Sequence, residues 1–327
     1  MKEIDITALG GVTIGQAEDA AAGTGCTLIL CENGMPAGLD VRGGAPASRE
    51  SEVLKPLAMM ERIQGILLSG GSAFGLDAAG GVMQALEERG IGYEVGPTHV
   101  PVVCESCLFD LTVGNCHVRP DKAMGYRAAQ AALAGGNYRD GNYGAGCGAT
   151  VGKWRGMDGC MKSGIGSYAV QTGDLQVGAI VAVNALGDVY DPETGRRLAG
   201  LRTEDGAGFA DTLSLMLENT ECVENKFTGN TTIGVILTNA LFGKAQLCKL
   251  AGMAHDGYAR AIRPVHTSAD GDSIYAASVG TLRADQDIVG ALAAEVMSRA
   301  IVRAVTGCES AYGYPAAKDF CPAGGQA

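Results

Sequence analysis

A short polar segment that leads into an apolar run carries the residues best suited to covalent chemistry. Gly229, Asn230 and Thr231 come first, and the apolar run 233–237 follows. A threonine hydroxyl placed there can attack the carbonyl that precedes it, and hydrolysis of the resulting ester leaves the threonine as a new N-terminus. That residue then holds both a nucleophile and a base, because an α-amine has a pKa of roughly 7.7–8.0. The same pattern is also typical of a plain turn into a strand, so the segment alone leaves both interpretations open.

An acidic pair further along the chain could serve this nucleophile. Asp270 and Asp272 are separated by Gly271. Alternate residues of an extended stretch face the same side, so both carboxylates would point one way, and the glycine would permit a close approach. Taken alone, such a motif is more often a turn or a solvated loop.

Composition limits the class of protein without identifying it. The chain has 327 residues, enough to bury a full core, and a net charge of −11, which argues against nucleic acid or an anionic membrane as the main partner. The segment Met1–Asp5 lacks the basic and apolar regions of a secretory signal, and no apolar stretch is long enough to span a bilayer. We therefore expect a cytoplasmic protein.

The cysteines and histidines give little support to a metal or redox centre. The 11 cysteines are expected to be reduced, and Cys104 and Cys107 form a lone C-x-x-C without a second pair. The four histidines show no ligand spacing of a known metal site. We predict no metal and no cofactor.

Hydrophobic patterning indicates strands flanked by amphipathic helices. We expect strands at 11–15, 26–31, 38–42, 63–68, 148–152, 166–170, 177–183, 231–239 and 273–278. We expect helices at 73–86, after Asp121, at 243–262 and at 285–306, the last ending at Gly307. The polar segment 186–229 is typical of a surface loop, and 321–327 of a disordered tail. Strands in the middle and helices outside predict an α+β protein, a four-layer αββα sandwich formed by residues 1–327 as one domain.

Two glycine-rich segments resemble motifs of other enzyme classes. The segment 69–75 follows a strand and opens a helix, as a nucleophile elbow does, but Phe74 stands where G-x-S-x-G needs its second glycine. The segment 144–148 leads into a strand-like run instead of the helix that a dinucleotide-binding turn requires. Neither an α/β-hydrolase nor a Rossmann domain is supported.

The ordered set of motifs resembles the L-aminopeptidase/D-amidase-esterase family, which includes β-peptidyl aminopeptidases and the nylon-oligomer hydrolase. The resemblance runs from Gly11 to Asp319. It rests on the segments 23–26, 40–46, 70–76, 119–123, 148–153, 229–232 and 263–267, the last leading into Asp270 and Asp272. Each motif is weak alone, whereas their order and coverage are specific.

This resemblance implies a self-processing N-terminal-nucleophile-like hydrolase with a fold related to that of ornithine acetyltransferase. It implies a single cut between Asn230 and Thr231, which would give an α chain 1–230 and a β chain 231–327. The expected substrate is a small peptide, amide or ester, and the expected assembly is a homotetramer of processed αβ units.

The resemblance also implies a role for each site residue. Thr231 matches the nucleophile, Lys153 a nearby lysine, and Asn184 the amide that faces the developing oxyanion. Asp270 and Asp272 match the pair that orients the nucleophile and its amine. Alternatives remain: Lys162 could replace Lys153, and Asn184 could be a turn residue. Phe109 stands where several members have tyrosine, which leaves substrate preference open.

Two further functions compete with hydrolysis. In an acyltransferase of the ornithine acetyltransferase type, an amine instead of water would resolve the acyl-enzyme, although the long motifs do not match that relative. An uncleaved binding or scaffold protein is the other alternative, and the complete set of site residues argues against it.

Overall fold

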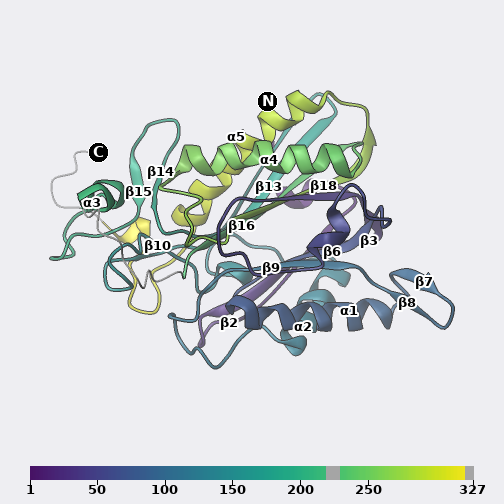
Figure 1. Cartoon of the computed structure of the whole chain (residues 1–327), viewed down its shortest axis with the longest axis horizontal. Helices are drawn as coiled ribbons and strands as arrows, with labels where there is room; N and C mark the ends of the chain where they lie inside the picture. The colour runs from purple at the N-terminus through teal and green to yellow at the C-terminus, as the bar shows by residue number, and fades with distance from the viewer. Residues whose placement is uncertain (219–228, 321–327) are drawn as a thin grey trace.

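Two β-sheets pack face to face, and pairs of helices cover their outer faces, in a computed structural model that describes residues 1–218 and 229–320 (Figure 1). The six-stranded sheet has the order β1 (Lys2–Ile4), β12 (Ile165–Thr172), β13 (Leu175–Asn184), β16 (Thr231–Ala240), β18 (Ser273–Leu282) and β4 (Ala37–Val41). The five-stranded sheet has the order β2 (Thr13–Asp19), β3 (Thr24–Met35), β6 (Ile63–Ser69), β9 (Val103–Cys107) and β5 (Ser48–Arg49).

Three apolar cores separate the four layers. One lies between the six-stranded sheet and helices α4 (Lys244–Ala261) and α5 (Gln286–Thr306). A second lies between the two sheets. The third lies between the five-stranded sheet and helices α1 (Ala78–Glu87) and α2 (Lys122–Leu133). This arrangement confirms the predicted αββα sandwich, and each helix buries one stripe because its apolar residues recur at helical spacing.

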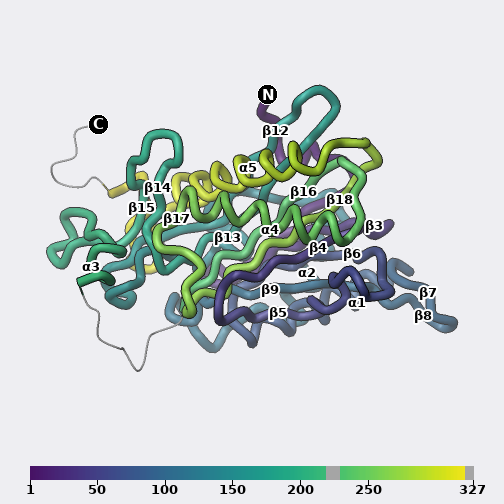
Figure 2. The backbone as a smooth tube through the Cα atoms, turned by 45° about the horizontal axis from the view of Figure 1, so that its top comes forward, coloured from purple at the N-terminus to yellow at the C-terminus, as the bar shows by residue number. Residues whose placement is uncertain are grey.

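Smaller elements extend the two ends of the sandwich. At one end lie β14 (Asp188–Tyr190), β15 (Arg197–Ala199), β17 (Ile262–Arg263) and α3 (Thr212–Glu218), and at the other the hairpin β7 (Tyr93–Val95) and β8 (Thr98–Val100) (Figure 2). The remaining pair is β10 (Thr150–Val151) and β11 (Met161–Lys162). Short 3₁₀ turns occur at Ile6–Ala8, Ser51–Leu54, Ser72–Asp77, Gly144–Gly146 and Ala317–Asp319.

The expectation of a surface loop over 186–229 was wrong where regular elements form within that segment. β14, β15 and α3 lie within it, and the buried Asp188 holds them together by accepting hydrogen bonds from the backbone N–H groups of Leu201 and Thr212. These strands are too short to show a clear periodicity. Residues 219–228 and the tail 321–327 lie outside the described residues.

Strand register brings three strand ends to one place. β13 and β16 are antiparallel, with Asn184 opposite Thr231 at the end of the ladder. β16 and β18 are parallel, and an isolated bridge between Asn230 and Asp270 extends their pairing. The carboxyl end of β13 and the amino ends of β16 and β18 therefore meet.

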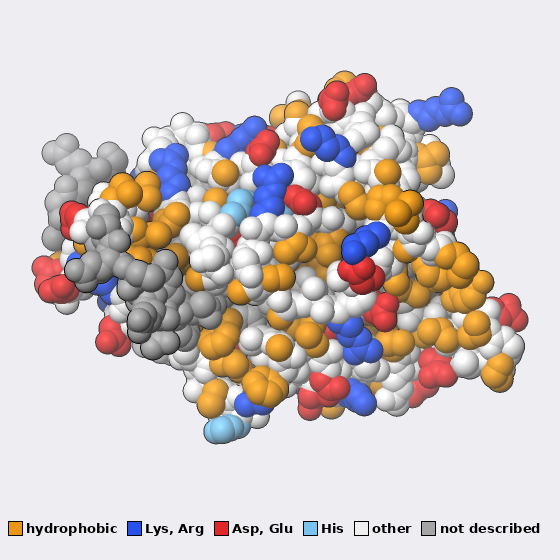
Figure 3. Space-filling view, viewed as in Figure 1, with side chains coloured by type: hydrophobic (Ala, Val, Ile, Leu, Met, Phe, Trp, Pro, Cys, Tyr) orange, Lys and Arg blue, Asp and Glu red, His pale blue; other side chains and the backbone are white. Residues whose placement is uncertain are grey.

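Within the described residues, none of the helices combines the length and the apolar character needed to cross a bilayer. On the face shown in Figure 3, acidic and basic side chains are interspersed instead of forming a large patch of one sign.

Helix α5 packs so closely on β12 that one position tolerates only glycine. A Cβ atom at Gly166 would lie 2.3 Å from both the Ala300 carbonyl oxygen and the Ala304 nitrogen. We predict that Gly166→Ala destabilises the fold by about 2–3 kcal/mol, because helix backbone must move away from the sheet. Gly10→Ala is the matched control, since a Cβ there meets open space. Thermal unfolding checks both, and equal melting temperatures would contradict this packing.

Candidate active site

Thr231 begins the central strand of the six-stranded sheet, at the point where the three strand ends meet. Its side chain is only 4% exposed, and its hydroxyl donates a hydrogen bond to the carbonyl oxygen of Asn230. A β-branched residue suits this buried strand start, and the apolar residues that follow anchor the strand in the cores on both faces. The hydroxyl is thus held against the carbonyl that it would attack.

Asn184 presents its side-chain amide to this segment in a fixed orientation. Its Oδ1 accepts from the Thr150 N–H at 3.0 Å and from Lys153 Nζ at 2.8 Å. Both partners are donors, so Oδ1 must face them and Nδ2 must face the other way. Nδ2 donates to the Phe109 carbonyl at 2.8 Å and to the Gly229 carbonyl at 3.2 Å.

Lys153 is a buried amine whose hydrogen bonds all go to neutral oxygens around the same strands. Nζ lies 2.9 Å from the Asn184 carbonyl oxygen and 2.9 Å from the Gly229 carbonyl oxygen, in addition to Asn184 Oδ1. Burial favours the neutral amine and lowers the pKa of Lys153 to about 7, while the acidic groups nearby oppose that shift. The amine is therefore partly neutral near pH 7.

The acidic pair lies beside the start of β16. Asp272 Oδ1 accepts from the Thr232 N–H at 2.8 Å, and Asp270 Oδ2 accepts from the backbone and the hydroxyl of Thr267. Burial raises the pKa of Asp270 to about 6, and the charge of Asp272 adds to the increase. Gly271 lies directly over the nucleophile, because a Cβ there would be 2.7 Å from Thr231 Oγ.

The structure separates the two lysines that the sequence left as alternatives. Lys162 is fully buried, but it donates to the carbonyl oxygens of Gly146, Ala149 and Ser163 and not to the segment around Thr231. Lys153 is the lysine in contact with Asn184 and Gly229. Asn184 ends β13 opposite Thr231, so it is a strand residue and not only part of a turn.

Sequence reasoning assigned no role to three groups that contact this site. His266 Nδ1 lies 2.8 Å from Asp272 Oδ2, and its backbone N–H donates to the same oxygen. The Phe109 carbonyl accepts from Asn184, and the Gly271 N–H donates to the Asn230 carbonyl at 3.1 Å. His266 lies in the motif 263–267 and could have been named as a site residue from the sequence. Backbone groups, in contrast, leave no signal in side-chain patterns.

The C-x-x-C motif takes no part in these contacts. Cys104 and Cys107 are free thiols within the buried strand β9. Within residues 1–218 and 229–320, no three His, Cys, Asp or Glu side chains are grouped so that they could hold a metal ion.

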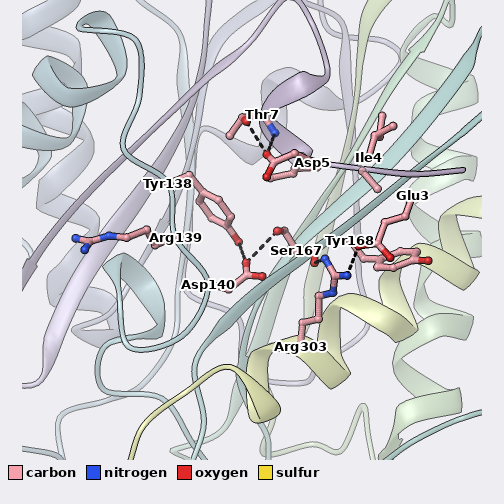
Figure 4. Close-up of a pocket in the computed structure, with 12 residues that line it drawn as sticks. Glu3, Ile4, Asp5, Thr7, Tyr138, Arg139, Asp140, Ser167, Tyr168 and Arg303 are labelled. Atoms are coloured by element: carbon pink, nitrogen blue, oxygen red, sulfur yellow. Dashed lines mark hydrogen bonds and ion pairs between the residues drawn. The ribbon is translucent and has the colours of Figure 1, made fainter.

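A separate polar cavity of about 450 Å³ lies along β1 and β12, where Tyr138 and Ser167 both donate to Asp140 (Figure 4). None of the site residues lines it.

Comparison with known proteins identifies the family. The model of peptidase family S58 matches residues 5–318. The chain belongs to peptidase family S58. An uncharacterized aminopeptidase of Mycobacterium leprae is 36% identical over 95% of this chain and 92% of its own length. A 6-aminohexanoate-oligomer endohydrolase of Kocuria sp. is 31% identical over 90% of this chain and 84% of its own.

A solved structure supports the fold at lower identity. The L-aminopeptidase D-Ala-esterase/amidase of Ochrobactrum anthropi, described as a variant of the Ntn hydrolase fold, superposes with a TM-score of 0.66 at 17% identity. The superposition covers 95% of this chain and 88% of the Ochrobactrum anthropi chain. The S58 protein described here is therefore an aminopeptidase/amidohydrolase with an Ntn hydrolase fold.

The buried amine gives a test of the site's electrostatics. Unfolding returns Lys153 to an ordinary lysine pKa of about 10.4, so between pH 7 and pH 10 the unfolded chain binds more protons than the folded one. Stability due to this group should therefore rise with pH in that window. Relative to Lys153→Met, the parent protein should gain up to about 1.4 kcal/mol per pH unit.

Urea unfolding at several pH values checks this prediction. Both proteins should carry Thr231→Ala, so that each is a single chain. Lys249→Met, on an exposed position of α4, is the matched control and should leave the pH dependence unchanged. If the unfolding free energies of Lys153→Met and its parent changed in parallel with pH, the pKa of the Lys153 amine would not be lowered in the folded protein.

Proposed function

We propose that this protein is a self-processing aminopeptidase or amidohydrolase in which Thr231 is the nucleophile of both the cleavage and the turnover. The observation that carries the proposal is the position of Thr231. Its buried hydroxyl donates to the preceding carbonyl, and it lies opposite Asn184 at the amino end of the central strand. A hydroxyl in a loop would lack these constraints.

Self-cleavage follows from this position in two steps. Thr231 Oγ attacks the carbonyl carbon of Asn230, the bond from that carbon to the Thr231 nitrogen breaks, and the nitrogen receives the hydroxyl proton. Water then hydrolyses the new ester, which leaves a carboxylate on Asn230 and a free hydroxyl and amine on Thr231. The chain divides into residues 1–230 and 231–327.

Turnover uses the groups that cleavage creates. The free α-amine accepts the Thr231 hydroxyl proton while Oγ attacks the substrate carbonyl. Asn184 Nδ2 is oriented by Thr150 and Lys153 and serves as donor to the oxyanion. The protonated amine then gives its proton to the leaving amine, and water enters to hydrolyse the acyl-enzyme.

In the proposal, Asp270 and Asp272 orient the Thr231 hydroxyl and its α-amine. Asp272 holds the Thr232 N–H next to the nucleophile and is itself held by His266. Lys153 favours the neutral amine of Thr231, and the acidic pair favours its protonated form. Because burial leaves Lys153 only partly charged near pH 7, its influence on the Thr231 amine is weaker than that of a fully charged lysine.

The substrate class follows from the relatives and from the chemistry of the site. We propose a short peptide, a small amide or an ester that presents its carbonyl to Thr231, and processed αβ units that assemble as a tetramer in the cytoplasm. Transfer of the acyl group to an amine is the second candidate, since an acyl-enzyme can be resolved by either nucleophile. A panel of amino-acid p-nitroanilides, with and without added amine, separates hydrolysis from transfer.

We predict that Thr231→Ala gives a folded, uncut and inactive chain. The wild-type protein should show a fragment of about 10 kDa, the share of 97 out of 327 residues in 33.4 kDa, with the N-terminal sequence Thr-Thr-Ile-Gly-Val. In the variant this fragment should be missing, and turnover should fall by about 10,000-fold or more, as when a catalytic nucleophile is removed. Denaturing electrophoresis, Edman sequencing and p-nitroanilide hydrolysis measure these outcomes.

Thr231→Ser is the matched variant, because it keeps the hydroxyl and should still process slowly. A single uncut band from active wild-type protein would refute self-cleavage. Full activity in Thr231→Ala would place the nucleophile elsewhere, and Thr232 or Ser72 would then be the next hydroxyls to test.

We also predict that blocking the new α-amine abolishes turnover. Selective transamination of the β-chain N-terminus converts the amine to a carbonyl, which cannot accept the hydroxyl proton. The reaction must be applied to the processed enzyme, since earlier modification would be confused with failed cleavage. Circular dichroism and sedimentation confirm fold and assembly, and full activity after verified modification would exclude the amine as base.

A further inference from the structure

The two carbonyl groups before Thr231 are held by different donors. The Gly229 carbonyl oxygen accepts from Lys153 Nζ at 2.9 Å and from Asn184 Nδ2 at 3.2 Å. The Asn230 carbonyl oxygen, one residue later, accepts from the Gly271 N–H at 3.1 Å and from the Thr231 hydroxyl. Among the described residues, no other hydrogen bond reaches the Asn230 carbonyl.

Backbone hydrogen bonds on both sides hold the Gly271 N–H in place. The bridge between Asn230 and Asp270 continues the parallel pairing of β16 and β18 by one step. From the other side, the Ala45 N–H donates to the Asp270 carbonyl at 2.8 Å, and the Arg42 N–H to the Asp272 carbonyl at 3.0 Å. Gly271 thus lies between the residue that precedes β16 and the segment that follows β4, with no side chain to separate its N–H from the carbonyl beside Thr231.

The chemistry of cleavage places charge on the atom that Gly271 holds. When Thr231 Oγ adds to the Asn230 carbonyl carbon, the π electrons of that carbonyl move to its oxygen, which becomes the oxyanion. The Gly271 N–H already points at this oxygen. Asn184 Nδ2 cannot serve it in the uncut chain, because both of its hydrogen bonds go to Phe109 and Gly229.

We propose that the protein uses two separate oxyanion donors: the backbone N–H of Gly271 for self-cleavage and the side-chain amide of Asn184 for turnover. This inference rests on the proposed function and extends it. Asn184 becomes available only when the Gly229 carbonyl leaves after the cut. The uncut chain therefore covers its own substrate site while it stabilises its own cleavage.

An amide-to-ester change at position 271 tests the proposal. Glycolic acid in place of Gly271, introduced by nonsense suppression during cell-free translation, removes the N–H and adds no side chain. The rate at which the 10 kDa fragment appears should fall by about 100-fold, as when a single oxyanion donor is lost. Turnover per cleaved molecule should fall much less than the cleavage rate does, because Asn184 is intact.

Lactic acid in place of Ala277 is the matched control. Ala277 lies in β18, six residues after Gly271, paired with Leu237 and remote from the scissile bond. Its ester also loses one strand N–H, so it should cleave at close to the wild-type rate. A merely structural effect would slow both esters or lower turnover as much as cleavage, and either result would overturn the proposal. Wild-type protein that turns over uncut would instead refute the proposed function itself.

A second measurement does not depend on the folding of the ester chain. In uncut Thr231→Ala protein, the hydroxyl donor is absent, and Gly271 is the remaining donor to Asn230. A ¹³C-labelled Asn230 carbonyl should then absorb in the infrared at the lower frequency of a hydrogen-bonded amide. Absorption at the frequency of a free carbonyl would overturn the assignment.

Discussion

The hydrogen bonds of the buried Lys153 amine determine how the rest of the site can be arranged. Nζ contacts the carbonyl and the side-chain oxygen of Asn184, and also the Gly229 carbonyl, so one group joins the end of β13 to the segment that enters β16. A buried amine without such partners would be costly, and this one is satisfied by neutral acceptors instead of a direct carboxylate contact. Burial lowers the pKa of Lys153 to about 7. The hydrogen bond from Nζ to Asn184 Oδ1 leaves the Asn184 amide donor facing Gly229.

The acidic groups around Lys153 limit how far burial lowers the pKa of its amine. Burial raises the pKa of Asp110 to about 6 and that of Asp270 to about 6, and the lysine charge opposes both shifts. The site therefore contains several groups that titrate within a narrow range around neutral pH. Their protonation states depend on one another, so a change at one residue alters the charge of the others. A pH–activity curve would describe the set of groups and not a single residue.

Much of the fold was predictable because the long elements have clear periods. The strand at 231–239, the helices at 243–262 and 285–306, and the four-layer order were all expected from apolar spacing, and the structure has them as β16, α4 and α5. The short strands β14 and β15 were missed because three residues cannot show a period. Within the site, side chains with typical motifs were predicted, whereas the Phe109 carbonyl and the Gly271 N–H depend on register, which only tertiary structure determines.

The position of Thr231 at a strand start also explains how a cut could be tolerated. β16 is paired along its length with β13 on one side and β18 on the other, and its apolar side chains enter the cores above and below the sheet. Breaking one peptide bond at its first residue removes none of these contacts. The new N-terminus would remain as rigidly placed as the strand itself, so the amine would arise within reach of the groups that it must serve. A nucleophile in a loop would gain the same amine but would lose the geometry that makes it useful.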